Sequence, residues 1–462
     1  MRFLVRALLL LILLGMAGLG VAWWLAGRQP GPVIAIESPE AFVGQSGALA
    51  FSVEAPGAVF RSVTAVLEQN GQPMPLFSLG PEGTDTGDVD PAAPDRLKVT
   101  RPLGRKAQPS LANGPARVTI TASRPVFYGL RTVESTLSRD LQVRLDPPRV
   151  SVASLHHFVN LGGAEFAVLR VSPEDAQAGV RVGQATYPAY PGSGAGLSDP
   201  ALRVVFFALH HDQKVGTPIS AFARDPAGNE TTTVMEHRPF AKAFVQSRIP
   251  IDQPFLDRVV PAIASNTHDL AVDTSTPEAR LQAFLTINGE LRRRNAETIV
   301  KVSSGTRPQM LWNEAFAQLG NSQVESRFAD RRTYFFGNKE IDRQVHLGFD
   351  LASVQQAPVL AANNGVVLFA EFLGIYGNCV IIDHGLGVQS LYAHLSSFTV
   401  KAGDDVRKSQ ELGRTGITGL AGGDHLHFSM LLQGVPVNSV EWWDPHWIED
   451  RVFRKVREAG GR

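Results

Sequence analysis

Apolar and polar residues are spaced differently in successive parts of the chain, and each spacing predicts a different kind of element. An uninterrupted apolar run covers 7–27, and positions that alternate between apolar and polar fill much of 33–240. Apolar residues spaced by three and four follow within 241–328, and short β-type runs bounded by glycine occupy 329–447. Alternation is typical of strands and the wider spacing is typical of helices. The sequence therefore predicts a mainly β protein with a helical segment, an α+β fold class.

The apolar run at the N-terminus predicts a membrane-spanning helix. Arg2 and Arg6 precede the run, which contains no charged residue, and Trp23 and Trp24 stand near its far end. A helix over this run measures roughly 30 Å, the thickness of a bilayer core, and tryptophan is common at the membrane interface. No clear cleavage motif follows it. We expect 1–28 to be an uncleaved signal anchor with its basic end in the cytoplasm; a cleaved signal peptide is the alternative.

The alternating stretches predict two β-sandwich-like modules, 29–147 and 148–240. The segment Ala-Arg-Asp-Pro-Ala-Gly-Asn-Glu at 223–230 resembles the closing hairpin of bacterial immunoglobulin-like domains, which favours a sandwich for the second module. One larger β domain is the alternative. The acidic, glycine-rich stretch 80–94 is expected to be a solvated loop, because it lacks the spacing of a calcium-binding EF-hand. The clearest strands are expected at 33–36, 48–53, 62–68, 116–122 and 141–145, and then at 149–155, 165–171, 203–209 and 219–224.

The segment 241–328 is predicted to be helical and to connect the β modules to the C-terminal region. A Thr-Pro-Glu sequence at 276–278 supplies a capping hydroxyl, a proline in the first turn and an acid near the positive end of the helix dipole. Apolar residues follow at near-helical spacing, and the helix is expected to end at the arginine run 292–294. A second helix is expected over 308–319. The segment is either a plain connector or a lid over a C-terminal site.

Charge and cysteine content narrow the class of protein. The 462 residues carry 44 basic and 44 acidic side chains, so no charge excess indicates a nucleic-acid partner. The single cysteine, Cys379, excludes an internal disulfide, and its apolar surroundings favour a buried structural thiol. The tail 448–462 is predicted to begin as a helix rich in lysine and arginine. No His-Glu-x-x-His, Gly-x-Ser-x-Gly or phosphate-binding glycine loop offers a competing catalytic signature.

Two histidines near the end of the chain have the spacing of a paired site. His425 and His427 are two residues apart, so in a strand they project to one face and Leu426 projects to the other. A His-x-His sequence alone is more often two ordinary histidines than a metal site. By contrast, the adjacent pairs 156–157 and 210–211 would face opposite sides of a strand, and we expect surface or packing roles for them.

A second motif supplies two more candidate ligands. His346 and Asp350 are four apart, roughly 13 Å along a straight strand, so they share a metal ion only if the chain bends between them. Gly348 is the residue at which a bend is easiest. Catalytic zinc usually takes three protein ligands and keeps one position for water. A His/Asp/His set meets that requirement, and further histidines such as His394 are then free to move protons.

Longer motifs show that 330–445 resembles the lysostaphin-type (LytM-like) zinc metallopeptidases of bacterial cell walls. The resemblance is carried by His-Leu-Gly-Phe-Asp-Leu-Ala at 346–352, Tyr-Gly-Asn-Cys-Val-Ile-Ile-Asp-His-Gly at 376–385, Leu-Tyr-Ala-His-Leu at 391–395 and His-Leu-His-Phe at 425–428. Ser409 departs from a turn glycine that is usual in the family, and it lies away from the site motifs. The resemblance implies an antiparallel β peptidase domain, expected at 329–447.

The resemblance also implies roles for individual residues. One zinc ion per chain would be held by three ligands: His346, Asp350 and His427. Two catalytic histidines would stand beside the metal: His394 and His425. His384 is usual in the family without being a ligand, so a structural role or a role in supporting a ligand is implied for it.

The function that the resemblance implies is a zinc endopeptidase that cleaves the peptide cross-links of bacterial peptidoglycan through a metal-activated water. Together with the anchor, it implies a single-pass protein of the inner membrane with most of the chain in the periplasm, or a soluble periplasmic protein if the signal is cleaved. Expected partners are peptidoglycan, the inner membrane and an envelope or divisome protein that the sequence does not identify. The alternative function is a non-catalytic wall-binding scaffold or an activator of cell-wall amidases, because some relatives have lost the zinc ligands.

Overall fold

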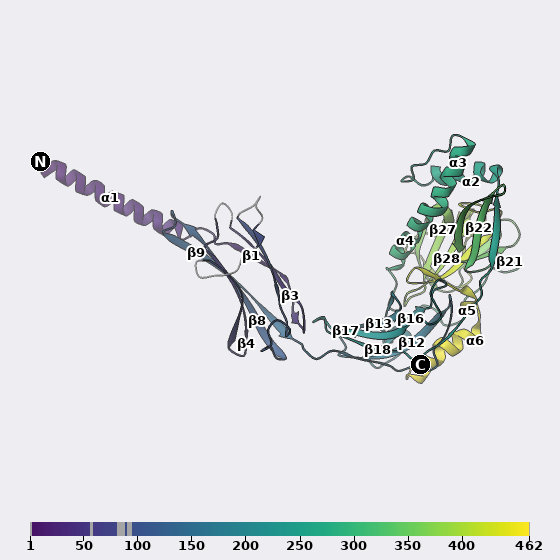
Figure 1. The fold of residues 1–462 in the computed structure, drawn as a ribbon, viewed down its shortest axis with the longest axis horizontal. Helices are drawn as coiled ribbons and strands as arrows, with labels where there is room; N and C mark the ends of the chain where they lie inside the picture. Colours follow the sequence, from purple (N-terminus) through teal and green to yellow (C-terminus); the bar gives the residue numbers. More distant parts are fainter. Residues whose placement is uncertain (1, 56–58, 81–87, 90–94, 462) are drawn as a thin grey trace. The chain divides into compact units, whose positions relative to one another are not determined.

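The computed structural model describes residues 2–55, 59–80, 88–89 and 95–461. The chain forms two compact units: the first is Met1–Pro148 with Arg224–Thr231, and the second is Arg149–Ala223 with Thr232–Arg462. Figure 1 traces the elements of both along the chain. The loop expected over 80–94 falls mostly outside the described residues.

The first unit consists of α1 (Arg2–Ala26) and a β-sandwich. One sheet has the strand order β1-β3-β7-β6 and the other has the order β2-β9-β8-β4-β5. Alternate residues of β3, namely Leu49, Phe51 and Val53, are buried between the sheets with residues of β4, so the alternation in the sequence is the burial pattern of a two-sheet core. The strands are β1 (Val33–Ser38), β2 (Phe42–Val43), β3 (Ala48–Glu54), β4 (Ser62–Gln69), β5 (Gln72–Leu79), β6 (Asp88–Val89), β7 (Arg96–Pro102), β8 (Gly114–Val126) and β9 (Arg131–Val143).

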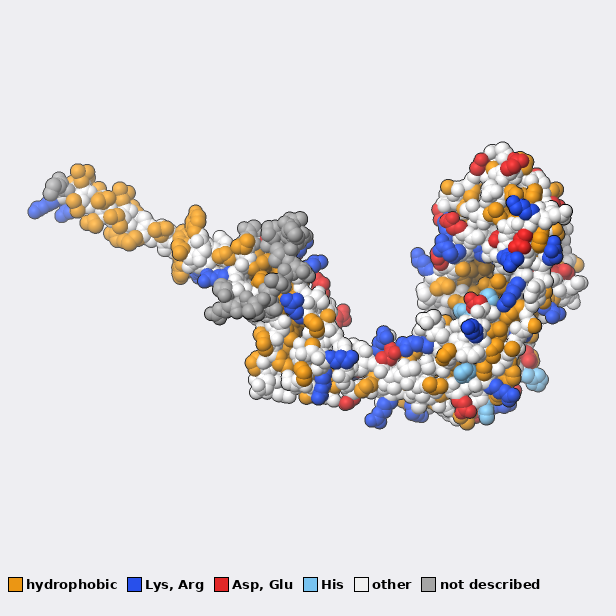
Figure 2. Space-filling view, in the orientation of Figure 1, with side chains coloured by type: hydrophobic (Ala, Val, Ile, Leu, Met, Phe, Trp, Pro, Cys, Tyr) orange, Lys and Arg blue, Asp and Glu red, His pale blue; other side chains and the backbone are white. Residues whose placement is uncertain are grey.

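Helix α1 is apolar and is largely uncovered by the rest of the chain, with Ala26 buried at its end. Its most apolar window has a mean hydropathy of 2.4, and none of that window is buried. Figure 2 shows hydrophobic side chains along its visible side. Length and composition therefore suit a membrane-crossing helix, and a signal sequence near an N-terminus has the same properties.

The second unit begins with two four-stranded sheets, ordered β10-β12-β16-β15 and β14-β13-β17-β18, beside a two-stranded pair of β11 and β19. Their inner faces share a core that includes Phe166 and Phe207, both fully buried. The strands are β10 (Arg149–Val152), β11 (Phe158–Asn160), β12 (Ala164–Ser172), β13 (Gln177–Val182), β14 (Ala185–Pro188), β15 (Tyr190–Pro191), β16 (Leu202–Ala208), β17 (Ile219–Arg224), β18 (Glu230–Val234) and β19 (Arg238–Phe240), with the short helix η1 (Gly192–Ala195).

This core continues into the C-terminal part of the same unit. The rings of Phe206 and Trp312 have centroids 6.2 Å apart, and Trp442 lies 5.5 Å from Phe206. A buried ion pair, Lys455 Nζ to Glu165 Oε1 at 2.8 Å, fixes the last helix to β12. The elements at the C-terminus are α5 (Ser439–Trp443), α6 (Pro445–Ile448), η4 (Glu449–Phe453) and α7 (Arg454–Glu458), which confirms the helix-like tail.

The helical segment is present, and its predicted start is confirmed. Thr276 caps α3 by accepting a hydrogen bond from the Ala279 backbone N–H at 3.1 Å. A further helix, α2, was not predicted; Asp252 caps it. The elements are β20 (Gln246–Ile251), α2 (Gln253–Ser265), α3 (Pro277–Thr286), the π-helix η2 (Ile287–Leu291) and α4 (Arg292–Ser303).

The helix does not end at the arginine run 292–294 as predicted. It continues through η2 into α4, because Asn288 is fully buried in η2 and makes a polar contact there. Its side-chain amide donates to Asp342 Oδ2 at 2.8 Å, and its oxygen accepts from Arg292 at 2.6 Å. The arginines therefore open α4 instead of closing α3.

The prediction of a helix over 308–319 is wrong. This stretch has no helical residues, and its backbone N–H groups bond to distant carbonyls: Leu311 to His384 at 3.0 Å and Phe316 to Trp442 at 3.0 Å. Trp312 and Phe316 are buried in the core of the unit. Their spacing suits a helix, but tertiary contacts satisfy the backbone groups and decide the conformation.

The C-terminal region is built on a large antiparallel sheet with the order β21-β24-β32-β28-β27-β26-β30, extended by β33, which pairs with β32. Two three-stranded sheets, β20-β22-β23 and β25-β31-β29, flank it. The predicted fold class, mainly β with helices, is confirmed. The strands are β21 (Gln323–Ser326), β22 (Asp330–Phe336), β23 (Lys339–His346), β24 (Phe349–Ala352), β25 (Pro358–Leu360), β26 (Gly365–Phe372), β27 (Asn378–Asp383), β28 (Val388–Leu395), β29 (Ser397–Phe398), β30 (Asp405–Val406), β31 (Glu411–Arg414), β32 (Leu426–Leu432) and β33 (Val435–Val437), with η3 (Gly374–Tyr376).

Candidate metal centre

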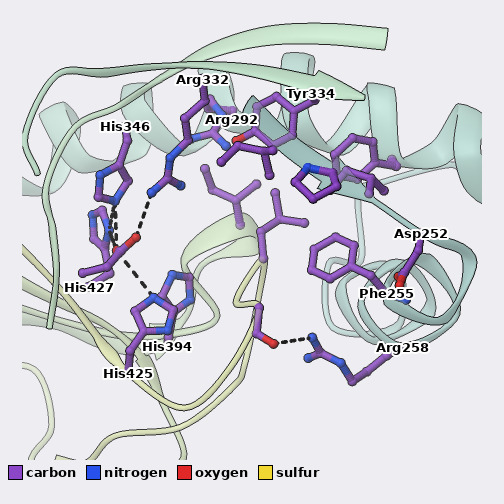
Figure 3. Close-up of a pocket in the computed structure, with 18 of the residues that line it drawn as sticks. Asp252, Phe255, Arg258, Arg292, Arg332, Tyr334, His346, His394, His425 and His427 are labelled. Carbon is purple, nitrogen blue, oxygen red and sulfur yellow. Dashed lines mark hydrogen bonds and ion pairs between the residues drawn. The ribbon is translucent and has the colours of Figure 1, made fainter. Parts of the chain in front are cut away.

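Three side chains from both sequence motifs converge at one point of the large sheet. His346 Nε2 lies 2.9 Å from Asp350 Oδ1 and 2.9 Å from His427 Nδ1, and the last two atoms are 3.1 Å apart. All three residues are buried or nearly so. Figure 3 shows His346 and His427 together at one end of a cavity. Atoms that all carry lone pairs converge in this way around a cation.

The bend predicted between His346 and Asp350 is present. Strand β23 ends at His346, β24 begins at Phe349, and Asp350 stands directly opposite His427 in the pairing of β24 with β32. Glycine is needed at position 348 for a different physical reason from the one expected. Its φ does not lie in the left-handed region, but a Cβ there would stand 2.5 Å from His427 Nε2. A glycine is required because the turn passes against the histidine ring.

The outer nitrogens of the two histidines are held by hydrogen bonds. His427 Nε2 lies 3.1 Å from Ser429 Oγ, which donates in turn to the Leu347 carbonyl at 2.8 Å. His346 Nδ1 lies 3.2 Å from the Arg327 carbonyl. With protons on these outer atoms, the inner nitrogens would keep free lone pairs, which is the tautomer that a metal ligand needs.

Arg332 holds the second oxygen of Asp350. Its Nη2 donates to Asp350 Oδ2 at 2.9 Å and to Ser326 Oγ at 2.8 Å, from strand β22 of the flanking sheet. The arginine thus occupies one carboxylate oxygen and leaves Oδ1 for the two histidines. Sequence reasoning did not single out this residue, because it lies outside both motifs and reaches the site from another sheet.

His394 joins the cluster through an irregular strand. Ala393 is the partner of His427 in the pairing of β28 with β32, so in a regular strand His394 would point to the opposite face. The register of β28 shifts between Tyr392 and Leu395, and His394 has a φ of 64°. This bulge turns its ring to 5.7 Å from that of His427.

His394 and His425 present the same ring atom to the site. Nδ1 of His394 donates to the Thr418 carbonyl at 2.8 Å, and Nδ1 of His425 donates to the Gly423 carbonyl at 2.8 Å. The Nε2 atoms are left for the cavity, and that of His425 lies 3.4 Å from Asp350 Oδ1. Both rings line the cavity, with centroids 4.9 Å apart.

The surroundings set different protonation states for these groups. Burial raises the pKa of Asp350, but the charge of His346 and hydrogen bonds from the histidines outweigh it, and the pKa lies well below its ordinary value. Burial, then repulsion from neighbouring histidines, holds the pKa of His394 well below its usual range. Burial also lowers the pKa of His425, yet the Asp350 carboxylate reverses this, and the net shift is upward.

The cluster lies in the wall of a cavity of about 670 Å³. Apolar side chains of β20 and the helices, including Ile251, Phe255 and Phe284, also line the cavity. Figure 3 shows Phe255 across the cavity from the histidines. Arg258 and Arg292 also line the cavity, and Arg258 donates to the Ala421 carbonyl at 2.8 Å. The helical segment is therefore part of the cavity wall.

The other histidines named from the sequence lie elsewhere. His384 is fully buried and hydrogen-bonds to the Asn364 carbonyl at 2.6 Å and to Ser390 Oγ at 2.7 Å, so these two bonds lead into the core. His157 is buried and bonds to Ser154 Oγ at 2.8 Å, whereas His156 is exposed. His384 does not line the cavity that holds the cluster.

The donor set fits a zinc ion. Two imidazole nitrogens and one carboxylate oxygen are ligands that zinc prefers, and tetrahedral zinc with bonds of 2.0–2.1 Å places its ligand atoms roughly 3.3 Å apart. The observed separations of 2.9 to 3.1 Å are close to that spacing. Ligands on one side and an open cavity on the other are the arrangement of a catalytic metal site rather than a closed structural one.

A candidate metal centre with two neighbouring histidines, set in a cleft on an antiparallel sheet, is the kind of site found in metallopeptidases. Residues 344–439 match the family model described as Peptidase family M23. The resemblance of this region to that peptidase family is therefore confirmed.

Two curated relatives and one solved structure illustrate the match. The chain is 44% identical over 97 residues to the DD-carboxypeptidase/endopeptidase Mpg of Neisseria meningitidis, covering 21% of this chain and 22% of that protein. It is 26% identical over 181 residues to the peptidoglycan DD-endopeptidase ShyA of Vibrio cholerae, covering 39% of each. It is 24% identical to the catalytic domain of lysostaphin from Staphylococcus simulans, covering 28% of this chain and 98% of that domain with a TM-score of 0.24. The match thus spans well under half the length of the curated relatives.

Proposed function

We propose that the chain is a zinc-dependent endopeptidase that cleaves peptide cross-links of bacterial peptidoglycan. The observation that carries the proposal is the convergence of His346 Nε2, Asp350 Oδ1 and His427 Nδ1 within 3.1 Å of one another on the wall of a cleft. These three residues would hold the ion. The intact set favours an enzyme over the alternative of a wall-binding scaffold or amidase activator.

The residues around the site supply the proton transfers that amide hydrolysis needs. A bound zinc ion would polarise the substrate carbonyl and lower the pKa of water. Hydrolysis takes one proton from water and delivers one to the leaving amine. His394, kept neutral by burial, offers an acceptor, and His425, beside the Asp350 carboxylate, offers a donor. Their Nδ1 bonds to backbone carbonyls keep both Nε2 atoms directed at the cavity.

The lining of the cleft supports an acidic peptide substrate. Arg258, Arg292 and Arg332 all line the cavity, and Asp350 and Asp252 are the only acids among its lining residues. Cationic side chains at a cleft favour substrates that carry carboxylates, and cross-linked wall peptides carry them. The names of the relatives, which include DD-endopeptidase activity on peptidoglycan, support the same substrate class.

The N-terminal helix supports a membrane location. We infer that α1 stays attached as a single-pass anchor in the inner membrane and that the rest of the chain lies in the periplasm. The uncovered apolar surface of the helix and Trp23 and Trp24 near its end support this placement. A cleaved signal peptide would instead release a soluble periplasmic enzyme.

The test is zinc content and digestion of purified cross-linked peptidoglycan by the full chain in detergent. We expect one zinc per chain and new amine termini, with both lost in His427→Ala. His425→Ala should keep the zinc and lose the digestion, because this histidine moves protons and is not a ligand. His237→Ala, which changes a histidine outside the cavity, is the control.

Two results would contradict the proposal. Digestion that survives His425→Ala and His394→Ala would remove the assigned proton transfers. A chain that binds no zinc and releases no new amine termini from peptidoglycan would make the scaffold or activator the better explanation.

A further inference from the structure

The hairpin between β8 and β9 has an exposed apolar tip. Tyr128 is fully exposed and Leu130 is 76% exposed, although aromatic and leucine side chains usually avoid water at turns. Phe127 and Tyr128 both have positive φ values, 48° and 55°. Glycine, asparagine or aspartate normally fill such positions, because a larger side chain is strained there. The tip therefore presents apolar side chains in a turn where folding alone would favour other residues.

Residues of this hairpin contact the end of α1 and the segment that follows it. On β9, Ser135 lies against Gly31 and Arg131 lies against Gly27, where a Cβ at either glycine would overlap them. Arg131 also donates to the carbonyl of Trp23 at 2.6 Å. As β9 is followed back from 135 to 131, its partners run back from 31 to 23. The tip at 127–130 lies beyond 131, so it continues alongside the end of α1.

The junction is held by several further contacts. Ala26, Val126 and Val133 form a small buried cluster with Phe127 packed on it. Arg124 donates to the Pro30 carbonyl at 2.9 Å from the other strand of the hairpin. Both strands are thus tied to the end of the helix, and the two glycines allow the close approach. The tip is placed by packing and not by a free linker.

Aromatic and cationic side chains gather at this level. The Arg131 guanidinium lies 4.1 Å from the ring of Trp23, and the Arg28 guanidinium lies 3.8 Å from the ring of Trp24. A helix of the length of α1 measures roughly 37 Å, which exceeds a bilayer core of about 30 Å and brings its last turns into the headgroup region. Tryptophan, tyrosine and arginine are the residues that favour that region.

We infer that the β8–β9 tip, Phe127 to Leu130, inserts into the interface of the phospholipid bilayer that α1 crosses. The inference rests on the proposed anchor and adds a second membrane contact to it. Tyr128 and Leu130 enter the boundary between headgroups and acyl chains, while Arg28 and Arg131 remain among the phosphates. The first β-sandwich is thereby held against the membrane instead of being free to swing on the helix.

The test places a fluorescent, polarity-sensitive label at single cysteines in the full chain, reconstituted in vesicles of phosphatidylethanolamine and phosphatidylglycerol with nitroxide-bearing lipids. Cys379 is buried, so an introduced cysteine is the accessible thiol. Labels go at Tyr128→Cys and Leu130→Cys, with Leu13→Cys reporting on α1. Asn70→Cys, in the turn after β4, is the matched control at the other end of the same sheet, roughly 40 Å away along β8.

The expected result is loss of most fluorescence at positions 128, 130 and 13 with nitroxide lipids, a blue-shifted emission at 128 and 130, and no change at 70. Quenching at 13 without quenching at 128 and 130 would overturn the inference while the anchor stands. No quenching at 13 would overturn the anchor, and quenching at 128 would then show that the tip binds lipid without it. A label at 128 that is shielded from water yet not quenched by lipid would replace the bilayer with a protein partner.

Discussion

The two carboxylate oxygens of Asp350 have different hydrogen-bond partners. Oδ1 meets His346 and His427 at 2.9 and 3.1 Å, whereas Oδ2 accepts from Arg332 at 2.9 Å. A carboxylate fixed in this way offers one oxygen to a metal in a defined direction. Residues that orient a ligand in this manner usually influence metal affinity although they never touch the ion.

We expect Arg332→Gln to weaken zinc binding roughly 10- to 100-fold, because the released carboxylate can rotate and shift toward the histidines. The measurement is competition for zinc against a chelating dye, which does not depend on activity. Arg331→Gln, on the neighbouring and exposed position of β22, should leave the affinity unchanged. Equal affinities for the Arg332 variant and the unmodified chain would show that Arg332 does not position Asp350.

Gly348 is expected to tolerate no side chain. A Cβ at this residue would lie 2.5 Å from both His427 Nε2 and Ser429 Oγ, so Gly348→Ala must displace the ligand ring or the turn. We expect a loss of about 1–3 kcal/mol in the free energy of unfolding, as for other overpacked sites, together with loss of bound zinc. Gly320→Ala, where a Cβ meets nothing within 4 Å, is the control. Zinc binding that persists in Gly348→Ala would contradict the close approach.

At the scale of elements, helix α5 is attached to the β module that precedes it through a buried acid. Glu441 accepts hydrogen bonds from Asn160 Nδ2 at 2.8 Å and from the Ala164 N–H at 2.7 Å, in β11 and β12. Burial, partly offset by these bonds, raises the pKa of Glu441 from 4.5 to about 7. The attachment of two parts of the unit is therefore sensitive to pH.

The sign of this effect follows from linkage. The folded chain binds the Glu441 proton more tightly than the unfolded chain, so the stabilisation by that proton is complete below pH 4.5 and is lost as pH rises through about 7. The change amounts to about 3 kcal/mol. We expect the free energy of unfolding to fall between pH 5 and pH 8 by more in the unmodified chain than in Glu441→Gln. Urea unfolding, followed by tryptophan fluorescence, measures the free energy of unfolding of both chains at each pH. If this free energy changes equally with pH in the two chains, the prediction is contradicted.

At the scale of the whole molecule, the proposed location depends on α1. We expect the mature protein to keep its N-terminal residues and to stay with the membrane after alkaline carbonate extraction, because the helix has an apolar surface with none of its most apolar window buried. Mass spectrometry of the N-terminal peptide and membrane fractionation measure the two properties. A mature chain that begins near residue 28 and leaves the membrane with the soluble fraction would favour the cleaved signal peptide.

Features that depend on local order along the chain could be predicted from the sequence alone. Alternation of apolar and polar residues predicted strands in both units, and the Thr-Pro-Glu start located α3. The grouping of His346, Asp350 and His427 came from the resemblance to a known family. His425 and His427 face one cavity because residues two apart in an extended chain share a face. The strands and the shared face of the two histidines could be predicted because the period of an extended backbone fixes them.

Features that depend on distant partners became visible in the fold and could not be predicted from the sequence. The stretch 308–319 is not helical, because its backbone groups bond to carbonyls far along the chain. Arg332 reaches Asp350 from a separate sheet, and His394 reaches the site through a bulge that reverses the face expected from its position in β28. A period along the chain carries no information about which remote group satisfies a hydrogen bond or displaces a residue, so packing alone settles these points.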